Sequence, residues 1–74
     1  MVKVIMESWR YGLKKVSLTK LQYEKLGLSL SESKTNTDML LDDQIIILEI
    51  EDENMAQEFL AEADKFGVNC KMIQ

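Results

Sequence analysis

Apolar and polar positions recur at two different spacings along this chain of 74 residues. Residues 2–7 alternate between apolar and polar side chains, which predicts a strand. Residues 44–50 are dense in isoleucine and predict a second strand, and residues 68–73 alternate again and predict a third. Helical spacing between these strands predicts helices over about residues 13–26, 30–40 and 53–66.

Glycine and serine mark a sharp corner between the first two predicted helices. Gly27 is placed to end the first helix in a left-handed conformation, which glycine adopts at little cost because it lacks a Cβ. Residues 29–32, Ser-Leu-Ser-Glu, follow the capping-box pattern and predict the start of the second helix. Residues 35–37 are poor helix formers, so they leave the end of that helix open. Asp52 and Gly67 are placed to begin and end the third helix.

The predicted order of elements is strand, helix, helix, strand, helix, strand. The last two strands and the helix between them form a crossover unit, which connects parallel strands and is expected to be right-handed. The first strand fits between these two. We therefore predict one α+β domain over residues 1–74: a two-layer β-α-α-β-α-β fold with a three-stranded sheet and the helices on one face.

The other face of the predicted sheet carries four isoleucines. Alternation places Ile5, Ile45, Ile47 and Ile73 there, among charged residues. An uncovered apolar patch often marks an interface, so one hypothesis is a homodimer that packs these faces together. The alternative is a monomer whose small sheet tolerates scattered exposed isoleucines.

Charge is divided unevenly between the two halves of the chain. Residues 1–34 hold seven Lys or Arg against three acidic residues, a net charge of +4, whereas residues 35–74 hold two against ten, a net charge of −8. A basic first half attracts an acidic protein partner, and the acidic second half opposes binding to nucleic acid. The simpler interpretation is that both halves are solvated polar faces.

The chain lacks the residues of the common catalytic and metal sites. It has no His and one Cys, so we expect no Ser/His or Cys/His pair, no zinc site and no internal disulfide. Cys70 alternates inward in a predicted strand and is expected to be buried and inert. No apolar run approaches the ~20 residues that span a bilayer. We therefore predict a cytosolic protein with no enzymatic activity, cofactor, metal or membrane contact.

Trp9, Arg10 and Tyr11 stand together in the predicted connection after the first strand. Such residues are enriched at interface hot spots, so they form a candidate loop contact for a partner. Amphipathic aromatic residues also fold over the ends of small cores. We favour this packing interpretation for Trp9, and both alternatives stay open for Tyr11.

Residues 15–34 combine Lys15-Val16 at the start of a helix, Lys20 near its middle, and the run Gly-Leu-Ser-Leu-Ser-Glu-Ser-Lys at 27–34. In these motifs, and in pattern over nearly its whole length, the chain resembles the C-terminal domain of the bacterial ribosomal stalk protein. The resemblance implies the same strand and helix order, with a docking surface for translational GTPases at the corner between the first two helices. The contact residues that it implies are Lys15, Lys20, Leu28, Glu32 and Lys34.

A more distant resemblance is to the Clp protease adaptor, which has the same topology and binds N-terminal degradation signals. The Asn-Asp-Asp-Tyr run of that family falls at Ser8, Trp9, Arg10 and Tyr11, of which only Tyr11 agrees. An arginine at this place repels the ammonium group of such a peptide, so this function ranks below the stalk-like one.

Overall fold

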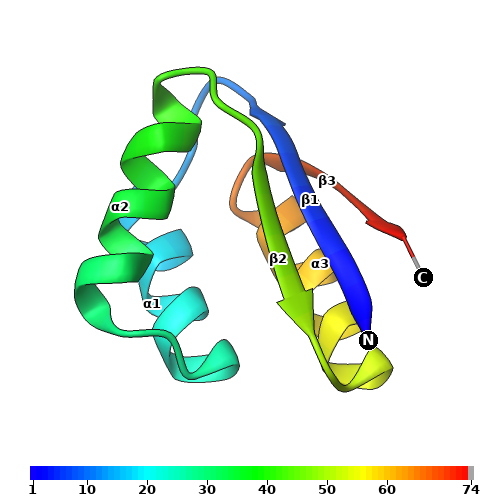
Figure 1. The fold of residues 1–74 in the computed structure, drawn as a ribbon. Coiled ribbons are helices and arrows are strands. Elements are labelled where there is room, and N and C mark those ends of the chain that lie inside the picture. The colour runs from blue at the N-terminus through cyan, green and yellow to red at the C-terminus, as the bar shows by residue number, and fades with distance from the viewer. Residues whose placement is uncertain (74) are drawn as a thin grey trace.

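The computed structural model describes residues 1–73 and confirms the predicted α+β fold (Figure 1). Its elements are β1 (Val2–Trp9), α1 (Lys15–Leu26), α2 (Leu30–Leu41), β2 (Ile46–Ile50), α3 (Glu53–Lys65) and β3 (Val68–Ile73). In the sheet, β1 lies between β2 and β3 and runs antiparallel to both. The strands β2 and β3 therefore run in the same direction, as the predicted crossover requires, and the helices lie on one face of the sheet.

The core lies between the helices and the inward face of the sheet. Strict alternation in β1 and β2 supplies most of its strand residues, and β3, at an edge, buries Val68 fully but Cys70 and Met72 only in part. In α3 the fully buried Phe59 is flanked by two buried alanines, which let the helix approach the sheet closely. The buried apolar residues are Val2, Val4, Met6, Leu18, Leu21, Leu40, Ile46, Leu48, Ile50, Ala56, Phe59, Ala63 and Val68.

The predicted end of α1 and the predicted starts of α2 and α3 are confirmed by their geometry. Gly27 has a φ of 73° and ends α1 in the left-handed conformation. The side chain of Ser29 accepts a hydrogen bond from the backbone N–H of Glu32 at 3.0 Å, which caps the start of α2. Asp52 caps α3 by accepting from the backbone N–H of Asn54 at 2.9 Å.

The strand β1 extends to Trp9, two residues beyond its predicted end at Glu7. A register shift between Met6 and Ser8 lets the strand continue, so that Trp9 pairs with Val68 of β3. The backbone N–H of Arg10 then donates to the carbonyl of Gly67 at 2.7 Å. Residues 8–10, which the sequence places in the connection after the first strand, thus pair with residues 67–69. The helix α1 then begins at Lys15 rather than Leu13.

Other boundaries shift for similar local reasons. The strand β2 begins at Ile46 rather than Gln44, because the backbone N–H of Gln44 bonds back to the carbonyl of Met39 at the end of α2. The helix α2 runs one residue further than predicted, through Leu41, despite the poor helix formers at 35–37. The helix α3 ends at Lys65, one residue before the predicted end.

Candidate functional site: the groove between α1 and α2

A buried polar network joins α1 to α2. The side-chain amide of Gln22, which is fully buried, donates to the hydroxyl of Thr37 at 3.0 Å and to the carbonyl of Ser33 at 3.3 Å. It also accepts from the amide of Asn36 at 3.0 Å. The hydroxyls of Thr19 and Thr37 lie 2.9 Å apart. Every buried polar side-chain atom among residues 1–73 has a partner, so the network holds the two helices in one arrangement.

The network explains why residues 35–37 do not end α2 early. Asn36 and Thr37 have side chains that compete with helical hydrogen bonds in many proteins. Here both side chains are occupied by Gln22, and the Thr37 hydroxyl also bonds the carbonyl of Ser33 one turn earlier at 3.1 Å. Tertiary contacts therefore override the weak helix propensity of these residues.

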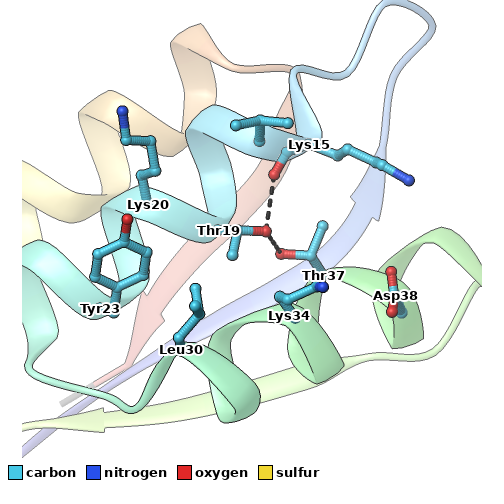
Figure 2. A pocket seen from close by; sticks show the side chains of 9 residues that line it. Lys15, Thr19, Lys20, Tyr23, Leu30, Lys34, Thr37 and Asp38 are labelled. Atoms are coloured by element: carbon cyan, nitrogen blue, oxygen red, sulfur yellow. Dashed lines mark hydrogen bonds between the residues drawn. The ribbon is translucent and has the colours of Figure 1, made fainter.

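Above this network lies a groove of about 450 Å³ between α1 and α2 (Figure 2). Thr19 and Thr37 face each other between the two helices and form its floor. The apolar lining residues are Val16, 68% exposed, Leu30, 56% exposed, and the half-buried Tyr23. Val16 thus lies outside the core, whereas Leu18 and Leu21 of the same helix are buried. Apolar side chains around a hollow of this kind offer contact area to a partner.

The groove also carries a surplus of positive charge. Lys15 and Lys20 of α1 and Lys34 of α2 line it, with Asp38 as the acidic residue of the lining. None of the ion pairs found among residues 1–73 involves these three lysines. Lys25 of the same helix differs, because its ammonium lies 3.2 Å from the carboxylate of Glu58. The charges of the groove are therefore available to a ligand.

The five residues implied by the stalk resemblance are divided between two grooves. Lys15, Lys20 and Lys34 share the α1–α2 groove. Leu28 and Glu32 line a second groove, together with β2 and the start of α3. Leu28 also packs against the core and is half-buried, so it takes part in folding the corner.

Sequence reasoning missed the buried polar network beneath the groove. Ser33 and Thr37 lie four residues apart and face the same side of α2, as do Leu18 and Gln22 on α1. This spacing of small polar residues opposite a glutamine was the available signal. It indicates a helix interface that is hydrogen-bonded rather than purely apolar.

Arg10 is engaged within the chain. Its guanidinium donates to the backbone carbonyl of Asp64 and to the side chain of Asn69, and lies 3.2 Å from the Asp64 carboxylate. These bonds fasten the end of β1 to the turn between α3 and β3. Trp9 belongs to β1 and stays 37% exposed, whereas Tyr11 is fully exposed. Of the predicted loop contact, Tyr11 is the side chain most open to solvent.

The open face of the sheet carries the predicted isoleucines. Ile5 and Ile47 are direct partners in the β1–β2 register. Ile45, just before β2, is 61% exposed, Ile47 is 58% exposed and Ile73 is 44% exposed, whereas Ile5 is half-buried. An ion pair of 3.3 Å between Glu7 and Lys71 crosses the same face.

Cys70 is half-buried on β3, facing the helices. Burial raises the pKa of its thiol to about 12, and the carboxylate of Asp64 adds to that effect. The thiol is therefore protonated at neutral pH and is a poor nucleophile. Across residues 1–73, no set of three or more His, Cys, Asp or Glu side chains is placed to hold a metal ion. The helices of this part of the chain lack the length and apolar character that crossing a membrane requires.

Comparison with known proteins adds no assignment. No family model matches the chain, and no curated protein or solved structure matches it. The resemblances to the ribosomal stalk domain and to the Clp adaptor stay predictions.

Proposed function

We propose that this protein is a protein-interaction module that binds an acidic, partly apolar segment of a partner in the α1–α2 groove. One observation carries the proposal. Lys15, Lys20 and Lys34, which take part in no ion pair found among residues 1–73, surround the exposed side chains of Val16 and Leu30.

The two kinds of residue have different effects on binding. The lysines attract an acidic segment and raise its association rate, an effect that salt weakens. Val16, Leu30 and Tyr23 supply apolar contact area, which slows dissociation. The Gln22 network holds the helices in place before binding, so little ordering is required when the partner arrives.

The resemblance to the stalk protein supports translational GTPases as the first partner class to test. In that family the same corner receives the GTPase, and the three groove lysines stand at matching positions of the motif. The proposed role is therefore to recruit a protein partner in the cytoplasm, without chemistry of its own.

Affinity capture with charge-reversed protein tests the proposal. The wild-type chain and a variant with Lys20→Glu and Lys34→Glu are immobilised, and proteins retained from the native lysate are quantified by mass spectrometry. We expect the variant to lose the specific partner while its thermal stability stays nearly unchanged, because both lysines are exposed. Equal recovery of the same partner by both proteins would reject the groove as the binding surface.

A second candidate function is self-association through the open face of the sheet. It is favoured by the direct pairing of Ile5 with Ile47, which creates an apolar centre on that face. Ile45 and Ile73 extend this patch. A homodimer that packs two such faces would leave the α1–α2 groove free, because the helices lie on the other side of the sheet.

A further inference from the structure

A second groove, of about 450 Å³, runs along the outer edge of β2. One side is lined by the consecutive residues 47–51, and the other by Leu26, Leu28 and Glu32 from the α1–α2 corner. Consecutive residues of a strand point to alternate faces. All of them border the groove because it follows the backbone of β2 rather than one face.

The backbone along this edge is open for pairing. The strand β2 has β1 as its neighbour in the sheet and lies at the end of the strand order. No hydrogen bond found among residues 1–73 joins the backbone of residues 46–51 to any element besides β1. An extended peptide can bind such an edge as an added strand, with main-chain hydrogen bonds providing affinity.

The side chains around the groove define which peptide fits. Leu48 and Ile50 of β2 point toward the helices, where Leu26, Leu28 and Met55 are partly buried apolar neighbours. An added strand repeats this alternation, so every second side chain of the peptide would face these apolar residues.

The remaining side chains of the peptide would face the open side of the sheet, beside Glu49, and Glu51 follows just beyond the end of β2. The lining also includes Glu32 and Asp52 but no lysine or arginine. Basic side chains at these alternate positions complement the carboxylates, as in other cross-strand charge pairs.

We propose that the edge of β2 binds an extended segment of a partner protein in which apolar and basic residues alternate. A second copy of the chain is a poorer occupant, because residues 35–74 carry a net charge of −8 and edge pairing would bring two such halves together. This site is independent of the lysine groove, since the two grooves favour ligands of opposite charge.

A synthetic peptide of alternating valine and lysine, about eight residues long, is the probe. It is titrated into isotopically labelled protein and followed by amide chemical shifts and hydrogen exchange. We expect shifts and slower exchange at residues 47–51, with residues 15–20 unchanged. A peptide N-methylated on every residue, which lacks the N–H donors of both edges, should bind at least about tenfold more weakly.

A protein variant distinguishes binding at the edge of β2 from general electrostatic attraction of the peptide to acidic residues. Glu49→Lys with Glu51→Lys should weaken binding at least about tenfold. The control, Glu24→Lys with Asp42→Lys, makes the same change in net charge at exposed positions outside the groove and should change affinity less than about threefold. Equal effects of the two variants, undiminished binding of the N-methylated peptide, shifts centred on the lysine groove, or no binding at about 1 mM peptide would each overturn the proposal.

Discussion

The side-chain amide of Gln22 donates a 3.0 Å hydrogen bond to the hydroxyl of Thr37 and so connects the middle of α1 to α2. Both side chains are buried, beneath the groove that we propose as the binding surface. A buried amide without partners is costly, so this bond favours the one helix arrangement in which all members of the network are satisfied. The position of the lysines relative to one another depends on that arrangement.

Gln22→Ala should lower the free energy of unfolding by about 2–4 kcal/mol. The substitution removes a partner from Thr37 and Asn36 and leaves a cavity between the helices. Urea unfolding followed by circular dichroism measures the loss. Gln57→Ala, at an exposed position of α3, is the matched control and should change stability by less than about 0.5 kcal/mol. A loss below about 1 kcal/mol for Gln22→Ala would mean that the network does not hold the helices together.

Leu28 and Leu30 form a second matched pair, two residues apart. Leu28→Ala should cost about 1–3 kcal/mol, toward the low end for core leucines, because Leu28 packs against the core but is only half-buried. Leu30→Ala should cost less than about 0.5 kcal/mol, because Leu30 is 56% exposed at the groove. Urea unfolding followed by circular dichroism measures both losses of stability. Equal losses for the two variants would show that the corner is packed differently.

The ends of the helices illustrate how much of the fold could be predicted from the sequence. Gly27, Ser29 and Asp52 act through their own backbone and the next turn, so the helix ends could be predicted from local sequence. The burial of Gln22 could not, because glutamine is usually exposed and its partners on α2 lie 11 to 15 residues away in the chain. The resemblance predicted that the lysines and Glu32 all belong to one contact surface. The tertiary structure places Lys15, Lys20 and Lys34 in the α1–α2 groove and Glu32 in the second groove.

Arg10 shows the same limit at the other end of the molecule. In sequence it stands between two aromatic residues and suggests a contact loop. Its ion pair with Asp64, at 3.2 Å, joins residues 54 positions apart and could not be predicted from spacing. The structure therefore gives Arg10 a role in holding the end of β1 in place, and its part in a loop contact stays a prediction.

Cys70 should react slowly with a thiol reagent in the folded protein. Its pKa is raised from an ordinary value of 9.0 to about 12, so the reactive thiolate is scarce at pH 8. Cys70 is partly exposed, so the reagent can reach it. Because the pKa is raised, we expect its reaction with Ellman's reagent to be at least about tenfold slower in the folded protein than in urea. Similar rates in the folded and unfolded protein would contradict the raised pKa.

The same pKa shift determines how the stability of the folded protein changes with pH. The thiol has a higher pKa folded than unfolded, so above pH 9.0 the unfolded chain loses this proton more readily. The contribution of Cys70 is therefore constant below that pH and falls as pH rises toward about 12. Cys70→Ser removes this part of the alkaline loss, which unfolding curves of both proteins at pH 8 and pH 10 would show. An identical loss of stability between pH 8 and pH 10 in both proteins would contradict the raised pKa of Cys70.

Self-association through the isoleucine face has its own test. If two open faces pack together, sedimentation velocity should show a dimer at tens of micromolar, and Ile47→Lys should convert it to monomer. Ile47 is 58% exposed, so the substitution should leave the fold intact. A monomeric wild-type chain, or a dimer that survives Ile47→Lys, would exclude this interface.

The association rate constant of the captured partner, once purified, tests the lysine groove most directly. It is measured for three proteins: the wild type, Lys20→Glu with Lys34→Glu, and a control with Lys3→Glu and Lys65→Glu. The control makes the same change in net charge at exposed lysines outside the groove. We predict at least about a tenfold lower rate constant for the groove variant at low salt, and a change below about threefold for the control. Equal rate constants for the groove variant and the control would contradict binding in the α1–α2 groove.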